Sequence, residues 1–171
     1  KKSKIIEFEN DPVSNQINKK YGAIVESGSQ VLATLENFNT IGVSPALDIA
    51  LGGGLREGSC VVMTGDPKTG KTTTALYFAA KAQKAGKNVF YFNTEGRLTK
   101  ENFKGIKDLD IDKIKIVQAT DKEPMVSAEK YLNTLETYIK NTPDLVAIVD
   151  STSSMVPQDE LDGEIRTGVR N

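Results

Sequence analysis

The sequence predicts an α/β fold in which a mostly parallel central sheet carries helices on both faces. Strand-like and helix-like stretches alternate along most of the 171 residues, as they do in sheets built from β–α–β units. One strand and helix flank a glycine-rich sequence typical of phosphate binding, and an acidic residue ends another apolar strand. Because right-handed crossovers bring the carboxyl ends of parallel strands to one edge of the sheet, we expect both features to meet there.

The composition leaves room for one sizeable core and narrows the function classes. Hydrophobic residues make up 38% and charged residues 26% of the chain, and a net charge of −1 gives no overall attraction to nucleic acid, so DNA binding would need a local surface. The chain has no histidine, so catalysis must use carboxylates, lysine, hydroxyls or a metal ion. The single cysteine, Cys60, lies in a predicted strand, and we expect a small core residue in a reducing cytosol. No apolar run reaches the length of a membrane span, so we expect no membrane partner.

The first predicted element is a helix over residues 12–21. Asp11 suits its N-cap, Pro12 suits its first turn, and Gly22 ends the pattern. Apolar residues recur every four positions and form a narrow stripe of Val13, Ile17 and Tyr21. This stripe either packs on the core or docks on another subunit, and the sequence leaves both interpretations open.

Short strands are expected next, at residues 23–25 and 31–34. We therefore divide the chain into residues 1–34, a helix and strand segment that could serve as an oligomerisation arm, and residues 35–171, a nucleotide-binding core. At the start of the core, Ser44 and the proline after it begin a helix that ends at a run of glycines.

A phosphate-binding loop is the most specific local feature, because it fits the pattern G-x-x-x-x-G-K-S/T. A short apolar strand is expected before it at residues 59–64 and a helix after it at residues 72–85, and these flanks disfavour a chance glycine turn. Lys71 should reach the β- and γ-phosphates of a nucleotide, and the Thr72 hydroxyl should ligate Mg²⁺. The candidate nucleotide-binding residues are Gly65, Asp66, Pro67, Lys68, Thr69, Gly70, Lys71, Thr72, Thr73 and Phe103.

Alternating elements complete the predicted sheet. Short apolar runs indicate strands at residues 88–93, 114–117 and 145–150. Helices are expected between them, at residues 99–107 and 123–140, and the second has its apolar residues along one face.

Two carboxylates at the ends of predicted strands are the candidate metal-binding and catalytic groups. An acid at the tip of a buried strand is costly without a cation or hydrogen bonds, so Asp150 fits a Walker B acid beside Mg²⁺; the alternative is a turn or N-cap residue. Glu95, just past a strand end, is the candidate general base for the water that attacks the γ-phosphate, and with Lys71 it forms the candidate catalytic pair. Its alternative is a solvated loop acid. Ser151 could share a metal-bound water or sense the γ-phosphate, and Phe103 could line a base pocket or belong to the core.

Four stretches resemble, in order and spacing, the core of bacterial and phage RecA-type recombinases. They are residues 44–55, 65–72, 92–95 and 148–151, and the first is much more specific than the phosphate loop. The resemblance implies a RecA-like P-loop NTPase core preceded by a short helix and strand segment.

Two further stretches extend the resemblance over most of the chain. Residues 17–22 resemble the end of the family's N-terminal helix, which packs on the neighbouring protomer, and residues 160–165 resemble the start of its first DNA-binding loop. The family core continues with more strands, a second DNA-binding loop and a glutamine that senses the γ-phosphate. None of these follows Asn171, so we expect the core to be incomplete at its C-terminal end.

The resemblance implies a DNA-dependent ATPase that uses ATP and Mg²⁺ in the cytoplasm of a bacterium or of a phage's bacterial host. Such proteins form helical filaments on single-stranded DNA and pair it with homologous double-stranded DNA in recombination and repair. By position, Lys71 and Thr72 carry over as phosphate and Mg²⁺ contacts, Glu95 as the catalytic glutamate and Asp150 as the Walker B acid. Phe103 falls one residue from the family's adenine-packing aromatic.

Two other functions built on the same core stay open. A hexameric replicative helicase would assemble as a ring and translocate on DNA, and a regulatory module would use bound ATP to control assembly. The N-terminal helix favours the recombinase, and Glu95 favours hydrolysis over pure regulation. Asn93 stands where the family usually has an acid, which should not abolish ATP binding.

Overall fold

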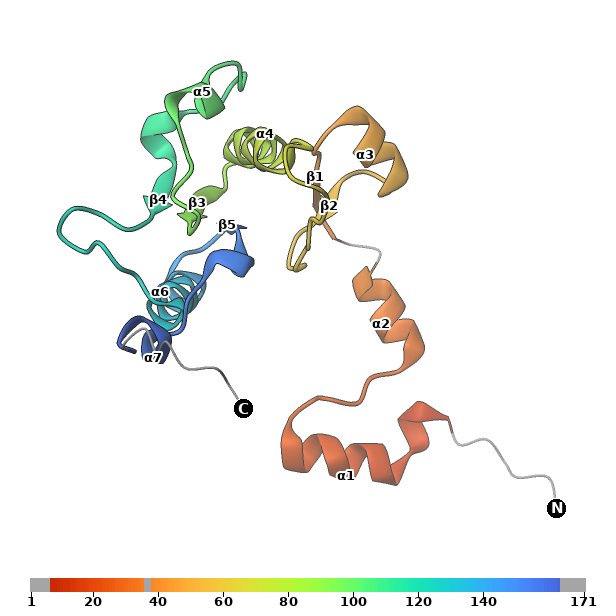
Figure 1. The fold of residues 1–171 in the computed structure, drawn as a ribbon. Coiled ribbons are helices and arrows are strands. Elements are labelled where there is room, and N and C mark those ends of the chain that lie inside the picture. The colour runs from red at the N-terminus through yellow and green to blue at the C-terminus, as the bar shows by residue number, and fades with distance from the viewer. Residues whose placement is uncertain (1–6, 36–37, 164–171) are drawn as a thin grey trace. The chain divides into compact units, whose positions relative to one another are not determined.

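The computed structural model describes residues 7–35 and 38–163, and the chain divides into two compact units between Thr40 and Ile41. The first unit is helical, and the second contains the parallel sheet (Figure 1). Of residues 160–165, the predicted start of a DNA-binding loop, only 160–163 are described, and residues 164 and 165 lie outside the described chain. Across the described ranges, no helix is both long and apolar enough to cross a membrane.

Helix α1 (Pro12–Tyr21) of the first unit forms as predicted, because a side chain caps its first turn. The Asp11 carboxylate accepts hydrogen bonds from the N–H of Val13 at 3.0 Å and from the hydroxyl of Ser14 at 2.5 Å. A 3-10 turn, η1 (Phe8–Asn10), precedes it. In the predicted apolar stripe, Val13 is 60% and Tyr21 61% exposed, so these two side chains lie open to solvent.

The strand predicted at residues 31–34 is wrong, because these residues belong to helix α2 (Gly28–Leu35). The side chains of Ser27 and Gln30 cap the first turn of this helix, because each accepts a hydrogen bond from the other residue's backbone N–H. The Gln30 N–H donates to Ser27 Oγ at 3.2 Å, and the Ser27 N–H donates to Gln30 Oε1 at 2.9 Å. This capping box outweighs the β propensity of the residues that follow it.

The strand predicted at residues 23–25 is also absent from the described chain. The side chain of Asn18 takes the place of a partner strand there: its Oδ1 accepts from the N–H groups of Ile24 and Val25 at 3.0 and 2.8 Å. Its Nδ2 donates to the Val25 carbonyl at 2.8 Å. The backbone groups are therefore satisfied without a β-ladder.

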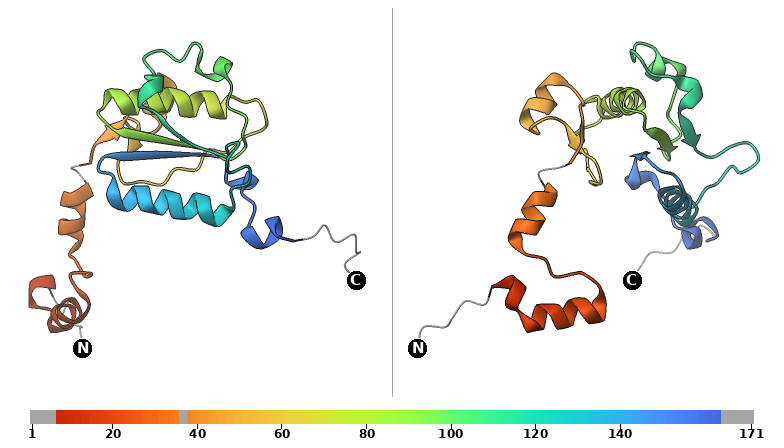
Figure 2. Two further views of the ribbon diagram at one scale, coloured as in Figure 1. Left: turned by 90° about the vertical axis from the view of Figure 1, so that its left-hand side faces the viewer. Right: turned by 180° about the vertical axis from the view of Figure 1, so that it is seen from behind.

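The second unit is built on a parallel sheet with the strand order β4-β3-β5. The central strand β3 (Asn88–Asn93) pairs in parallel with β4 (Lys115–Val117) and with β5 (Leu145–Asp150). Helix α4 (Lys71–Lys84) covers one face and α6 (Ala128–Asn141) the other (Figure 2). The predicted parallel sheet with helices on both faces is confirmed, as expected for β–α–β crossovers.

Strand β3 is the buried centre of this sheet. Its side chains alternate between the faces, so that Val89 and Tyr91 join the cluster beneath α4, while Phe90 and Phe92 pack against α6. The remaining buried members of the α4-side cluster are Ile41, Leu76, Ala79, Ala80, Ala82, Ile106 and Ile114. Burial on both faces explains why the strand is a continuous apolar run rather than an alternating one.

Two predicted helices exist but are shorter than expected. The helix predicted at residues 99–107 is confined to α5 (Lys100–Phe103), because Gly105 follows with a left-handed φ of 86°. The helix predicted at residues 123–140 begins only at Ala128, where the hydroxyl of Ser127 caps the first turn. Both differences follow from local capping that overrides the apolar periodicity.

Short elements complete the second unit. Helix α3 (Pro45–Ala50) forms as predicted, with Ser44 as its N-cap. A small separate sheet contains β1 (Thr40–Ile41) and β2 (Leu55–Arg56). Gly54 has a φ of 126°, and a Cβ there would lie 2.4 Å from the Ile41 carbonyl oxygen, so only glycine fits. The other elements are η2 (Ile111–Lys113), η3 (Thr152–Ser154) and α7 (Gln158–Leu161).

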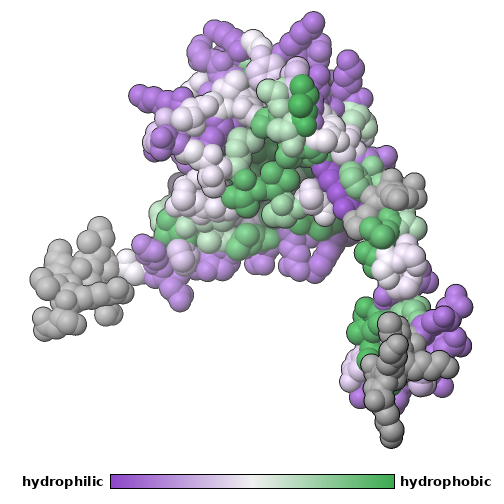
Figure 3. All heavy atoms as spheres, turned by 90° about the vertical axis from the view of Figure 1, so that its right-hand side faces the viewer, coloured by the Kyte–Doolittle hydropathy of each residue, from purple (hydrophilic) through white to green (hydrophobic). Residues whose placement is uncertain are grey.

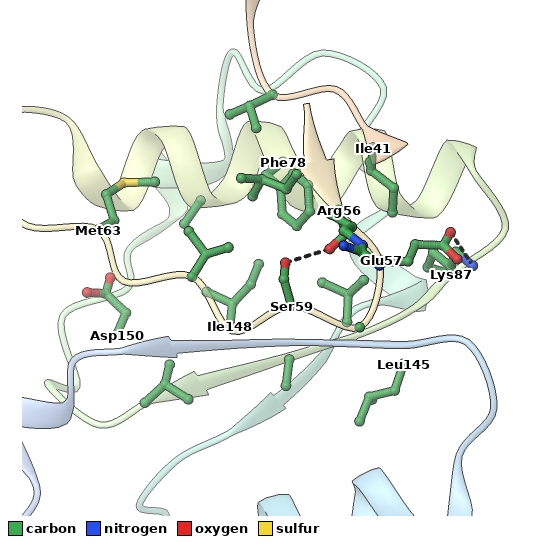
Figure 4. Close-up of a pocket in the computed structure, with 18 of the residues that line it drawn as sticks. Ile41, Arg56, Glu57, Ser59, Met63, Phe78, Lys87, Leu145, Ile148 and Asp150 are labelled. Carbon is green, nitrogen blue, oxygen red and sulfur yellow. Dashed lines mark hydrogen bonds and ion pairs between the residues drawn. The ribbon is translucent and has the colours of Figure 1, made fainter. Parts of the chain in front are cut away.

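The strand predicted at residues 59–64 does not form in the described chain, and Cys60, expected in the core, is exposed. A strand needs a partner edge, and a cleft of about 450 Å³ lies between this segment and β5 (Figure 4). Apolar side chains such as Val61, Met63 and Ile148 line the cleft, and Figure 3 shows apolar side chains gathered around a hollow. Within the described residues, β5 has a strand partner on one side only.

Candidate functional site

The predicted phosphate loop forms a concave run of backbone before α4. Gly65 has a φ of 157°, and Lys68 and Gly70 have φ values of 63° and 91°. Left-handed residues within such a loop turn successive N–H groups toward one point, which makes an anion-binding nest. Gly70 is the N-cap of α4, so the positive end of a 14-residue helix adds to this field.

Side-chain hydrogen bonds hold the loop closed on itself. The ammonium group of Lys71 donates to the carbonyl oxygens of Gly65 and Asp66, at 2.8 Å each. The hydroxyl of Thr69 also donates to the Asp66 carbonyl, at 2.8 Å. The Lys71 charge therefore lies over the loop, where a phosphate group could replace the carbonyl oxygens as its partner.

The end of the phosphate loop meets the end of β5 through Thr72 and Asp150. The Thr72 hydroxyl donates to Asp150 Oδ2 at 2.7 Å, across 78 residues of sequence. Both residues are half-buried. They supply a hydroxyl and a carboxylate oxygen, which are hard ligands that suit Mg²⁺; this ion usually takes one or two protein groups together with substrate phosphates and water. The donor set therefore fits the predicted metal.

Tyr91 is a third member of this group that the sequence reasoning missed. Its hydroxyl donates to the same Asp150 oxygen at 2.6 Å. Burial and, to a smaller extent, the neighbouring carboxylate raise the pKa of Tyr91 well above its usual value, so the phenol keeps its proton. The signal was the strand alternation: Tyr91 lies two residues before Asn93, which pairs with Asp150, and so shares its face.

Glu95 lies just beyond the end of β3 and is held by β5. Its N–H donates to the Asp150 carbonyl at 3.3 Å, and its Oε1 accepts from the Ser151 hydroxyl at 2.8 Å. Its other oxygen forms an ion pair with Arg97 at 3.4 Å. The structure thus brings together Glu95 and Ser151, which the sequence predicted as separate candidates. The ion pair with Arg97 was not predicted, because only the fold of the loop after β3 creates it.

Three further predicted residues lie on nearby elements. Thr73 is exposed in the first turn of α4. Asn93 is buried and donates to the Gln118 side chain at 2.6 Å. Phe103 is half-buried in α5 and packs against the cluster beneath α4, and its contact with a nucleotide base stays a prediction.

The cleft beside β5 opens at the phosphate loop. Lys71, Asp150 and Ser151 line it together with the apolar residues of segment 59–63 and β5. Figure 4 shows the carboxylate of Asp150 on the cleft side of the strand end, near Met63. The arrangement places a cationic side chain, a hydroxyl and a carboxylate around one anion-binding loop, which is what binding of a phosphate–metal pair requires.

Comparisons with known proteins identify relatives of this chain. The chain is 30% identical over 155 residues to Protein RecA of Rippkaea orientalis, covering 90% of this chain and 42% of the relative. It is 32% identical over 158 residues to Protein RecA of Clostridium acetobutylicum, covering 91% and 43%. For Protein RecA of Synechocystis sp., the identity is 31% over 152 residues, covering 88% and 40%.

These matches cover most of this chain but less than half of each relative. The chain spans about two fifths of the length of these relatives. The family model for the RecA N-terminal domain matches residues 10–169, which is nearly the whole chain. The chain therefore belongs to the RecA family, and residues 10–169 match its N-terminal domain.

Proposed function

We propose that this chain binds ATP with Mg²⁺ and hydrolyses it as the ATPase core of a DNA recombinase. The contact between Thr72 and Asp150 carries the proposal, because it joins the phosphate loop to an acid on a separate strand at 2.7 Å. A glycine loop alone is a common turn, whereas a loop joined to a Walker B acid supports nucleotide binding with a metal.

Each residue has a distinct task in this proposal. The loop N–H groups and Lys71 hold the β- and γ-phosphates, and the Thr72 hydroxyl and Asp150 hold Mg²⁺, which would neutralise charge on the phosphates. Glu95 accepts a proton from the attacking water, as a general base must lie within hydrogen-bond reach of it. In the structure both oxygens of Glu95 are engaged, one by Ser151 and the other by Arg97. A carboxylate can accept about four hydrogen bonds, so the attacking water can bind Glu95 alongside these two contacts.

We further propose that the full-length protein binds single-stranded DNA as a helical filament and pairs it with homologous double-stranded DNA. The family membership supports this function, and it also supports a location in the cytoplasm of a bacterium or of a phage's host. The exposed stripe residues Val13 and Tyr21 support an oligomerisation arm within residues 1–34.

ATP hydrolysis by the full-length protein, measured with and without single-stranded DNA, tests the proposal. Strong stimulation by DNA, lost in the Lys71→Ala variant, is the expected result. Hydrolysis at the same rate with and without DNA would support the ATPase activity but overturn the proposed recombinase function. Hydrolysis coupled to unwinding by a ring would favour the helicase, and binding without hydrolysis would favour the regulatory module.

A further inference from the structure

The hydroxyl of Tyr91 reaches the Asp150 carboxylate from within the core of the sheet. Tyr91 is completely buried, in the same cluster as Leu76 and Ala79 of α4. On β5 its direct partner is Ile148, so Asp150 is its diagonal neighbour two residues further on. An aromatic side chain can span this diagonal, and the phenol oxygen lies 2.6 Å from Asp150 Oδ2.

Asp150 Oδ2 accepts from two hydroxyl groups of different character. Thr72 donates at 2.7 Å from the first turn of α4, next to the exposed phosphate loop. Tyr91 donates from a ring that is packed on all sides and cannot turn away. Among the described residues no donor bonds to Oδ1 of Asp150, so the two hydroxyl groups together orient the carboxylate through one of its oxygens.

We infer that Tyr91 is a positioning residue, which holds the carboxylate of Asp150 in the orientation needed for Mg²⁺ binding whether or not nucleotide is present. The inference rests on the proposed function of Asp150. A hydroxyl–carboxylate bond of 2.6 Å is short and charge-assisted, and it fixes the rotamer of the acid. Groups that hydrogen-bond to metal-binding carboxylates typically change metal affinity or activity by about 10- to 100-fold when removed.

A simpler interpretation is that the buried phenol needs an acceptor and Asp150 happens to be near. Both interpretations predict some loss of stability when the hydroxyl is removed. Only the positioning role predicts a change in how much Mg²⁺ the protein needs. The Mg²⁺ dependence of nucleotide binding therefore separates the two.

The test uses the full-length protein and a fluorescent ATP analogue, with binding measured by equilibrium titration over a range of free Mg²⁺. Tyr91→Phe keeps the ring and removes the hydroxyl. The expected result is a rise of about 10-fold or more in the Mg²⁺ concentration at half-maximal binding. Tyr131→Phe is the matched control, since Tyr131 is also a buried tyrosine but packs with Phe90 and Phe92 on the opposite face.

A Mg²⁺ midpoint in Tyr91→Phe that equals the wild-type midpoint, or that shifts no more than in Tyr131→Phe, would overturn the inference. Thermal unfolding without nucleotide verifies that each variant is folded. If Tyr91→Phe does not fold, 4-fluorophenylalanine at position 91 fills the space of the hydroxyl without a donor and takes its place in the titration.

A double variant tests whether the Tyr91 hydroxyl acts on Mg²⁺ binding through Asp150. In an Asp150→Ala background, removal of the Tyr91 hydroxyl should leave the Mg²⁺ midpoint unchanged, because the group that it positions is gone. A further shift there would also overturn the inference. If the wild-type protein binds nucleotide equally well with and without Mg²⁺, the proposed metal site itself is wrong, which is a distinguishable result.

Discussion

Replacement of Asp150 by alanine or asparagine separates its structural role from its proposed metal-binding role. In the folded chain its Oδ2 accepts hydrogen bonds from Tyr91 at 2.6 Å and Thr72 at 2.7 Å. Asparagine keeps a carbonyl oxygen that can accept both bonds, whereas alanine removes the acceptor. The two variants should therefore differ in stability but share a defect in Mg²⁺ binding.

The magnitude follows from the burial of the two donors. In Asp150→Ala the Tyr91 hydroxyl is left buried without a partner, which costs about 1–3 kcal/mol. The half-buried Thr72 hydroxyl can turn to water, so its loss adds about 0.5–1.5 kcal/mol. We expect Asp150→Ala to lower the free energy of unfolding by about 1.5–4.5 kcal/mol and Asp150→Asn by about 1 kcal/mol or less.

Urea unfolding of the nucleotide-free protein, followed by circular dichroism, measures this difference. Equal destabilisation by alanine and asparagine would refute the reasoning, because it would show that the negative charge rather than the acceptor oxygen matters. No destabilisation in Asp150→Ala would show that the Tyr91 hydroxyl finds another partner. Both variants should need much more Mg²⁺ for nucleotide binding, since neither carries the carboxylate charge.

Four further predictions follow from individual contacts. Lys71→Ala should reduce ATP turnover by roughly 100-fold or more, since it removes the cation that stabilises charge on the phosphates; wild-type hydrolysis in this variant would sink the site assignment. Glu95→Gln should leave ATP bound but slow its cleavage by roughly 100- to 10,000-fold in single-turnover assays, and loss of binding instead would mean that Glu95 is structural. The Ser14 hydroxyl and the Val13 N–H hold the pKa of Asp11 below its usual value, so this cap stabilises α1 above the ordinary pKa of an aspartate and is lost as the pH falls through the lowered pKa. Amide exchange in α1 should thus increase in acid, and Asp11→Asn should remove that dependence. Cys60 is exposed, so it should react with an aromatic disulfide reagent as fast as an unfolded control peptide; slow reaction would show that segment 59–63 is covered.

Local signals predicted many elements correctly, because their causes lie within a few residues of sequence. The cap at Asp11, the proline after Ser44 and the glycine loop before Lys71 each act over one helical turn. At residues 31–34 the strand-like composition and the helix cap predicted different structures. The hydrogen bonds between Ser27 and Gln30 cap a helix there, so these residues belong to α2.

Strand prediction failed where pairing was required. Residues 59–64 have the composition of a strand, yet they lie along the cleft without a partner in the described chain. Residues 88–93 have a similar apolar character and do pair, because β4 and β5 lie on both sides of them. Strand formation depends on a neighbour as well as on composition.

The sequence by itself determined which residue types could do the chemistry: a phosphate loop with its lysine and threonine, and two acids that follow apolar strands. Only the tertiary structure decided which of them touch. The register that pairs Asn93 with Asp150 joins residues 57 positions apart, and it sets Tyr91 and Thr72 on one carboxylate oxygen and Ser151 on Glu95. Register is a property of two packed strands and of the helix above them. A one-residue slip would turn Asp150 to the opposite face, so the strand alternation could point to Tyr91 only once the register was known.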